Sequence, residues 1–241
     1  MNNSIKLSLL IVASIVAIQF SACKKECGNL TTEVVSIAEQ IQGVIIEGPW
    51  EVSITQDDTD NSAVLEYCAD WKVSAKMLSN GYLHIKISSW GHSSHSNDVF
   101  RATIKAATLK KIEASGAADI RTYGHFTGTT TDVDLSGASE VNFNEINFEK
   151  CTVKCSGAST FKSSGYAAKT SFNGSGASHF KTLNLTSENL DIDLSGASEA
   201  EVTVNNAIKG KLSGASILRY KKAKDVSGVS TSGASKIIRL D

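Results

Sequence analysis

The chain has 241 residues, which is long enough for one or two domains with a substantial hydrophobic core. Its single proline, 18 glycines and 7% aromatic content suit an all-β repeat protein. The formal net charge is −1 and the sequence contains no large basic face, so nucleic acid is not expected as a partner.

Residues 1–22 have the features of an export signal. Lys6 precedes an apolar run, Leu7 to Phe20, that is too short for a membrane-spanning helix. The run ends in Phe20-Ser21-Ala22-Cys23, which resembles the lipobox of bacterial lipoproteins, with Phe where Leu is commoner. The resemblance implies cleavage before Cys23 and lipid attachment to this cysteine. An ordinary secretory signal is the alternative, and both interpretations place the protein outside the cytoplasm.

Residues 23–39 are expected to form a tether. Four cysteines follow Cys23 in the sequence: Cys27, Cys68, Cys151 and Cys155. The export compartment allows disulfides. On one extended strand, Cys151 and Cys155 would have Cα atoms about 13 Å apart, too far for a disulfide. Buried free thiols are therefore predicted there, unless a corner intervenes. A bond between Cys27 and Cys68 is left open.

Residues 40–105 form a β-rich section without a strict repeat. Alternating apolar residues predict strands near 44–47, 51–54, 62–67, 83–87 and 99–104, with an Asn80-Gly81 turn before the fourth. This section is interpreted as an irregular start or cap for the repeats that follow, because an open repeat end exposes strand edges. Whether it is a separate domain is left open.

Residues 106–241 carry the tetrapeptide Ser-Gly-Ala-Ser, or a one-letter variant, seven times. The glycines are separated by 21, 20, 19, 20, 18 and 19 residues. A period near twenty indicates one supersecondary unit stacked on copies of itself. The seven repeat glycines are Gly116, Gly137, Gly157, Gly176, Gly196, Gly214 and Gly233.

The residues around each glycine predict a strand, a bend and a second strand. Positions two and four before the glycine are mostly apolar and the position between them is mostly polar, as in Val133-Asp134-Leu135. Another apolar column, which includes Val141, follows four residues after the glycine. Helical repeats need more than about thirty residues, and the Leu and Asn pattern of leucine-rich repeats is absent.

The predicted fold is therefore all-β: a right-handed parallel β-helix, or β-solenoid, with coils of about twenty residues stacked about 4.8 Å apart. In this register Asp191 lies beside Lys209 and Asp193 beside Lys211. Gly48-Pro49-Trp50 resembles a degenerate copy of the bend. Seven equivalent Ser-Gly pairs are interpreted as a structural ladder and not as catalytic serines.

Few residues suggest chemistry. His92 and His95, with Trp90 nearby, form a candidate ligand surface, although a plain polar loop is the simpler interpretation because no third metal ligand is fixed by the sequence. Asp119, Glu140 and Glu199 share a column that is interpreted as a solvated face. No catalytic residue, metal or cofactor is predicted. The even coil length leaves no room for the long loops from which β-helical lyases and hydrolases build their clefts.

The order of motifs resembles the putative auto-transporter adhesin, head GIN domain family. It is carried by Val44 to Gln56, Gly81 to Ile85 and Leu109 to Ile120, followed by the Ser-Gly-Ala-Ser repeats. The resemblance implies a secreted or lipid-anchored β-helical protein of Gram-negative envelopes. The expected function is a non-enzymatic envelope lipoprotein, an adhesin or protein-interaction solenoid, anchored to the membrane by lipid and binding a protein or glycan. A carbohydrate-binding or carbohydrate-cleaving β-helix is the alternative, and the membrane face is left open.

Overall fold

The computed structural model describes residues 29–89 and 98–241, and every regular element in these ranges is a β-strand. No described segment forms a helix that could cross a membrane. The strands are β1 (Leu30–Val34), β2 (Gly43–Glu47), β3 (Glu51–Gln56), β4 (Ser62–Cys68), β5 (Lys72–Met77), β6 (Tyr82–Ser89), β7 (Phe100–Ala106), β8 (Lys111–Ser115), β9 (Asp119–Tyr123), β10 (Phe126–Leu135), β11 (Glu140–Cys155), β12 (Thr160–Gly174), β13 (His179–Leu194), β14 (Glu199–Leu212), β15 (Ile217–Lys222), β16 (Asp225–Thr231) and β17 (Lys236–Arg239).

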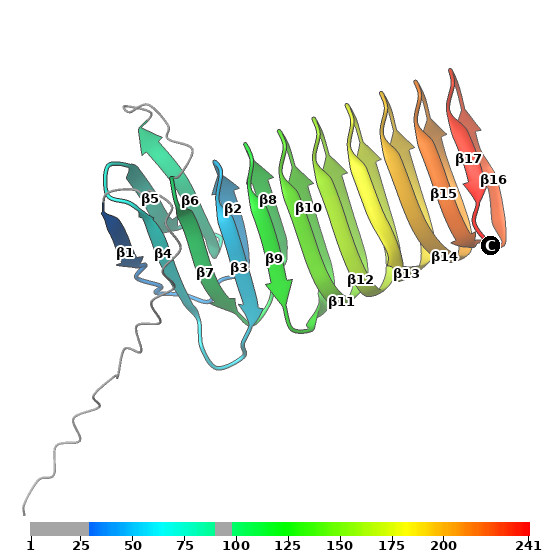
Figure 1. The fold of residues 1–241 in the computed structure, drawn as a ribbon. Helices are drawn as coiled ribbons and strands as arrows, with labels where there is room; N and C mark the ends of the chain where they lie inside the picture. The colour runs from blue at the N-terminus through cyan, green and yellow to red at the C-terminus, as the bar shows by residue number, and fades with distance from the viewer. Residues whose placement is uncertain (1–28, 90–97) are drawn as a thin grey trace, which may run out of the picture.

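The repeat region is a parallel β-solenoid of about six turns, which confirms the predicted architecture (Figure 1). Each long strand from β11 to β14 runs through one coil, from the end of one Ser-Gly-Ala-Ser corner to the start of the next. Equivalent residues lie side by side, so Val153 is the register partner of both Val133 and Phe172. The predicted pairs Asp191 with Lys209 and Asp193 with Lys211 are also register partners.

The corners show why the repeat needs glycine. Gly157 has φ +70°, and a Cβ atom there would lie 2.5 Å from the carbonyl oxygen of Gly137 in the preceding coil. That oxygen also accepts a hydrogen bond of 2.8 Å from the Ala158 amide. The conformation and the contact therefore each exclude a side chain.

The last serine of the motif closes the corner from inside. Ser159 is buried, and its Oγ donates to the Ser156 carbonyl at 2.9 Å. Ser198 makes the same bond to Ser195 at 2.7 Å. These hydroxyls are consumed by backbone hydrogen bonds, which agrees with a structural ladder.

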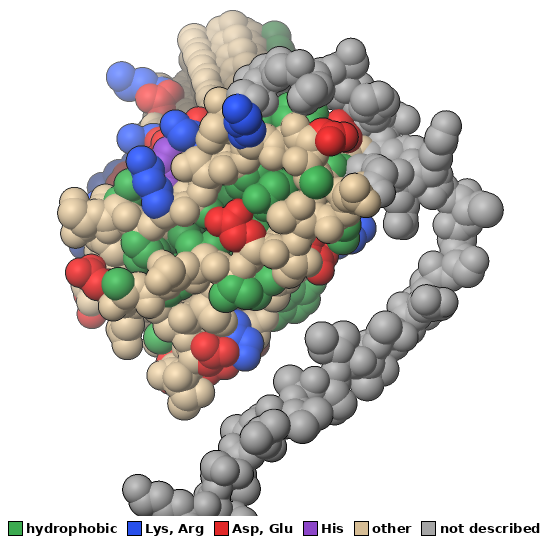
Figure 2. All heavy atoms as spheres, turned by 90° about the vertical axis from the view of Figure 1, so that its left-hand side faces the viewer, with side chains coloured by type: hydrophobic (Ala, Val, Ile, Leu, Met, Phe, Trp, Pro, Cys, Tyr) green, Lys and Arg blue, Asp and Glu red, His purple; other side chains and the backbone are tan. Residues whose placement is uncertain are grey.

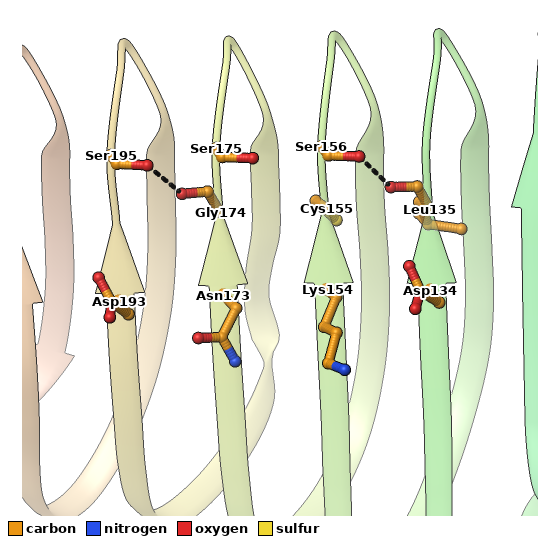
Figure 3. A pocket seen from close by; sticks show the side chains of 10 residues that line it. All are labelled: Asp134, Leu135, Lys154, Cys155, Ser156, Asn173, Gly174, Ser175, Asp193 and Ser195. Carbon is orange, nitrogen blue, oxygen red and sulfur yellow. Dashed lines mark hydrogen bonds between the residues drawn. The ribbon is translucent and has the colours of Figure 1, made fainter.

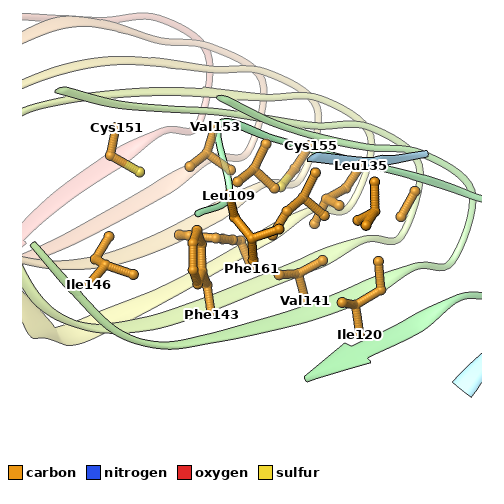
Figure 4. Close-up of a cluster of buried hydrophobic side chains, with 14 of the residues drawn as sticks. Leu109, Ile120, Leu135, Val141, Phe143, Ile146, Cys151, Val153, Cys155 and Phe161 are labelled. Atoms are coloured by element: carbon orange, nitrogen blue, oxygen red, sulfur yellow. The ribbon is translucent and has the colours of Figure 1, made fainter. Parts of the chain in front are cut away.

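The core is a continuous stack of apolar side chains between the two strand faces of the coils (Figure 4). Phe143, Val153 and Phe161 are fully buried in its middle. Further along, Phe172 and Phe180 stack with ring centroids 4.9 Å apart and an interplanar angle of 14°. Inward-facing residues on consecutive coils thus fill one interior.

The N-terminal section joins the same sheet in an order that does not follow the chain. β2 pairs in parallel with both β6 and β8, and β3 pairs with both β7 and β9. The first coil therefore lies between the coil of β6 and β7 and the coil of β8 and β9. In this register Gly48 lies against Gly116, the first repeat glycine, since a Cβ atom on Gly116 would lie 3.2 Å from the Gly48 backbone. The Gly48-Pro49-Trp50 bend therefore takes the place of a repeat corner in the first coil.

The two ends of the solenoid differ. At the N-terminal end, β5 pairs antiparallel with β6, β4 with β7, and β1 with β4. Figure 2 views this end, where hydrophobic side chains are scattered among polar ones, and Leu30 and Val34 are exposed. At the other end, β16 pairs with β14 and β17 with β15, and most side chains of this last coil are half or fully exposed.

Candidate functional site

A shallow hollow of about 400 Å³ lies on the outer face of the strands that lead into the corners (Figure 3). We call it the ladder hollow. It spans the ends of β10 to β13, and its lining residues are Asp134, Leu135, Lys154, Cys155, Ser156, Asn173, Gly174, Ser175, Asp193 and Ser195. Because side chains alternate between the two faces of a strand, each of these coils contributes one polar residue here, two positions before the first serine of its corner.

The polar side chains of the ladder hollow form one column of mixed charge, in the order Asp134, Lys154, Asn173 and Asp193. Lys154 is the register partner of both Asp134 and Asn173, and Asn173 also neighbours Asp193. One ammonium group therefore lies among two carboxylates and an amide. The serine hydroxyls beside this column are partly engaged, since Ser156 Oγ donates to the Leu135 carbonyl at 3.3 Å.

The spacing of the two carboxylates bears on the chemistry that the ladder hollow could support. Asp134 and Asp193 are three coils apart, or about 14 Å at 4.8 Å per coil. Glycoside hydrolases hold their two carboxyl groups about 5–9.5 Å apart. Asp134 and Asp193 therefore do not form such a pair.

The strands that follow the corners carry a face of ion pairs. Lys162 lies 2.5 Å from Glu140, and Arg219 contacts Glu199. Each carboxylate of the predicted solvated column is thus matched by a cation from its own or the next coil, including Asp119, which pairs with Arg121 at 2.7 Å. The described residues contain no group of three or more His, Cys, Asp or Glu that could hold a metal ion.

A second hollow, of about 160 Å³, lies on this face where β3 and β9 run side by side. We call it the tyrosine hollow. Its lining residues are Glu51, Val52, Ser53, Asp119, Arg121 and Tyr123. The hydrogen bond from Arg121 to Asp119 raises the pKa of the guanidinium. Tyr123 belongs to no sequence motif, although its alternation with Asp119 and Arg121 marks all three as outward-facing.

The other predicted site residues fall into two groups. The seven repeat glycines lie at the corners, each with a positive φ. The lipidation candidate Cys23 and the candidate ligand surface of Trp90, His92 and His95 lie outside the described residues.

Three of the later cysteines are described. Cys68 is disulfide-bonded, and Cys27, whose bond to Cys68 was left open, lies outside the described residues. Cys151 and Cys155 are free and buried, as predicted. Burial raises the pKa of both thiols to about 12, because a buried thiolate would lose its hydration.

We expect the two thiols of the folded chain from Lys24 onward to resist iodoacetamide at pH 8.5. The reactive thiolate is scarce at this pH when the pKa is near 12, whereas an unfolded thiol has a pKa of about 8.5. In denaturant without reductant, two thiols should react and mass mapping should place both labels on Cys151 and Cys155. Because folding raises these pKa values, the thiols should also cost stability as the pH rises from about 8.5 towards 12. Rapid labelling of the native chain would contradict this account.

Comparisons with known proteins give the family and the fold. A family model described as putative auto-transporter adhesin, head GIN domain, matches residues 41–223. No curated protein matches the sequence.

Several crystal structures share the fold at low sequence identity. A putative adhesin from Bacteroides fragilis superposes with a TM-score of 0.79 and 17% identity, over 88% of this chain and 98% of its own. A putative lipid binding protein from Parabacteroides distasonis gives 0.69 and 14%, over 89% and 98%. A putative adhesin from Parabacteroides merdae gives 0.63 and 12%, over 90% and 98%. At these identities the likeness establishes the fold alone.

Proposed function

Because the chain belongs to the putative auto-transporter adhesin, head GIN domain family, we propose that it is a lipid-anchored adhesin of the cell envelope that binds a protein partner and catalyses no reaction. The family supports an adhesin at the cell surface or in the envelope. The lipid anchor, the lack of catalysis and the protein partner are the parts that the proposal adds.

The observation that carries the protein partner is the charge pattern of the ladder hollow. Asp134 and Lys154 lie in neighbouring coils and Asp193 lies two coils further on, beyond Asn173, on strands whose backbones are hydrogen-bonded to both neighbours. The backbone that carries these side chains loses little conformational freedom when a partner binds, and the order of the charges selects a partner with the complementary pattern. None of the ten lining residues is aromatic, whereas sugar sites commonly offer an aromatic ring.

Cys23 is only a few residues along the chain from the first described strands, so a lipid on Cys23 would orient the solenoid relative to the membrane. Five residues separate Cys23 from Asn29, so six Cα–Cα steps join them, and the Asn29 carbonyl accepts a hydrogen bond of 2.9 Å from the Ala69 amide. A fully extended chain of six residues spans about 20 Å. A lipid on Cys23 would keep the antiparallel end of the solenoid close to the membrane and leave the last coil farthest from it.

The proposal predicts attachment to a protein surface that depends on the ladder hollow. Beads carrying the chain from Lys24 onward, coupled through its N-terminus, are passed over separate coatings of fibronectin, laminin, collagen and albumin. We expect saturable attachment to at least one matrix protein. Exchanging the charges with Asp134→Lys and Lys154→Asp should reduce it about tenfold, because the net charge and the cross-strand pair are kept but the pattern is inverted.

The matched control exchanges an ion pair on the opposite face, with Glu140→Lys and Lys162→Glu, and should attach like the unchanged chain. Cells that display the full chain should lose attachment when Cys23→Ser removes the anchor, while the beads do not need Cys23. Attachment no stronger than to albumin would refute the proposal, as would equal attachment of the two exchange variants. Loss of attachment after enzymatic removal of glycans from the coating would instead favour a carbohydrate ligand.

A further inference from the structure

The tyrosine hollow combines groups from two segments that are distant in the sequence. Asp119, Arg121 and Tyr123 alternate along β9 and point outwards, while Glu51 and Ser53 do the same on β3. The register sets Glu51 beside Asp119 and Ser53 beside Arg121. The hollow is thus a two-strand surface with an aromatic ring at one end and carboxylates at the other.

Tyr123 supplies an apolar surface that is open to solvent. Tyr123 is 49% exposed, more than any other aromatic residue that the structure describes. The tyrosine ring is flat and rigid, and it loses only two side-chain torsions on binding. A flat apolar ligand face could lie against it without rearrangement.

The carboxylate end offers hydrogen-bond acceptors in a fixed position. Arg121 donates to Asp119 Oδ2 at 2.7 Å and so fixes the carboxyl group. The other oxygen, Oδ1, is buried and accepts no hydrogen bond from the described residues. Because Oδ1 is shielded from solvent while the side chain is 37% exposed, Oδ2 is the oxygen that a ligand hydroxyl would reach.

The charge and the size of the tyrosine hollow narrow the class of ligand. Glu51 pairs with Arg101 at 3.5 Å and Asp119 pairs with Arg121 at 2.7 Å, so each carboxylate is matched by a cation and a neutral ligand is favoured over a charged one. A volume of about 160 Å³ is smaller than the 300–1,000 Å³ typical of sites for drug-sized ligands, so a single ring fits better than a long molecule.

We propose that the tyrosine hollow binds one neutral hexose unit of a glycan, with the apolar face of the sugar ring on Tyr123 and its hydroxyls donating to Asp119 and Glu51. The site lies on the opposite strand face from the ladder hollow, so this inference goes beyond the protein partner proposed above. It gives the adhesin a second, chemically different contact.

The test uses the chain from Lys24 onward and the methyl glycosides of glucose, galactose and mannose in saturation-transfer-difference NMR. Because the site is small and shallow, we expect at least one to bind with a Kd on the order of 1 mM. Tyr123→Ala should weaken binding about tenfold, whereas Tyr123→Phe, which keeps the ring, should bind like the unchanged chain. Asp119→Asn should also weaken binding, because it removes the charged acceptor.

Tyr166 supplies a matched control, since it is 37% exposed and lies on β12 away from the hollow. Tyr166→Ala should leave binding unchanged, and melting temperatures should show that all variants are folded. The proposal is overturned if no neutral glycoside binds, if methyl glucuronide or methyl glucosaminide binds more tightly, or if Tyr123→Ala and Tyr166→Ala behave alike. Bead attachment to proteins would be untouched by any of these results, so the two proposals fail independently.

Discussion

Gly157→Val is expected to lower the free energy of unfolding by about 3 kcal/mol or more, and to lower Tm by roughly 10 °C. A β-branched residue at φ +70° is strained, and its Cβ would lie 2.5 Å from a backbone oxygen that cannot move without losing its own hydrogen bond. Thermal and urea unfolding, followed by circular dichroism, would measure the change.

Two control variants distinguish the effect of the corner glycine from the effect of any substitution in the solenoid. Lys162→Ala removes one side of a partly exposed ion pair and should cost less than about 1 kcal/mol. Gly233→Val meets a similar contact, 2.7 Å from Gly214, but in the last coil, which can fray without unstacking a neighbour. It should therefore cost less than Gly157→Val. Equal melting temperatures for Gly157→Val and Lys162→Ala would overturn the role of the corner.

The spacing of the repeat made much of the fold predictable. A side chain in a solenoid is constrained by its equivalents in the coils on both sides, so a column in the sequence becomes a column in space. This is why the partners of Asp191 and Asp193 could be assigned from register alone. The burial of Cys151 and Cys155 followed from the same alternation.

The N-terminal order could not be predicted because no repeat connects its strands. β2 lies between β6 and β8, which follow it by tens of residues, and several parallel pairings would satisfy the same apolar alternation. The tyrosine hollow depends on this order. Glu51 and Asp119 become neighbours only when the first coil is inserted next to β9, so no local motif joins them in the sequence.

The two candidate sites differ in how far the repeat pattern predicts which residues lie together. Asp134 and Lys154 occupy one repeat column, so their proximity was implied once the fold was known, but the sequence did not mark that column as a hollow. The tyrosine hollow lies where the regular coils meet the irregular section. In a repeat protein, residues at the corners and in the core are constrained by stacking, so binding residues can differ between coils only at the other positions.

Gly174 departs from the apolar column two residues before each repeat glycine because of its contacts in the core. Its position holds Leu135, Cys155 and Leu194 in other coils, so the pattern alone would favour a larger apolar residue. A Cβ there would lie 2.8 Å from the Phe180 ring and 2.7 Å from Leu194. A side chain at position 174 would therefore crowd both Phe180 and Leu194, and Gly174→Leu should destabilise the chain by about 1–3 kcal/mol even though it restores the repeat.

Phe180→Ala is expected to cost about 3–5 kcal/mol, because it removes a fully buried ring that stacks on Phe172 at 4.9 Å and leaves a cavity. If Gly174 is small because Phe180 is large, adding Gly174→Leu to this variant should recover part of the loss. Urea unfolding of the two single variants and the double variant should show that the double costs less than the sum by about 1 kcal/mol or more.

A remote pair tests whether this coupling is specific. Phe126 is equally buried but lies at the start of β10, far along the solenoid from Gly174. Phe126→Ala combined with Gly174→Leu should give the sum of the two single effects to within about 0.5 kcal/mol. If the Phe180 pair were also additive, the glycine would not be compensating for the ring, and the contact with Leu194 alone would explain why this coil departs from the repeat.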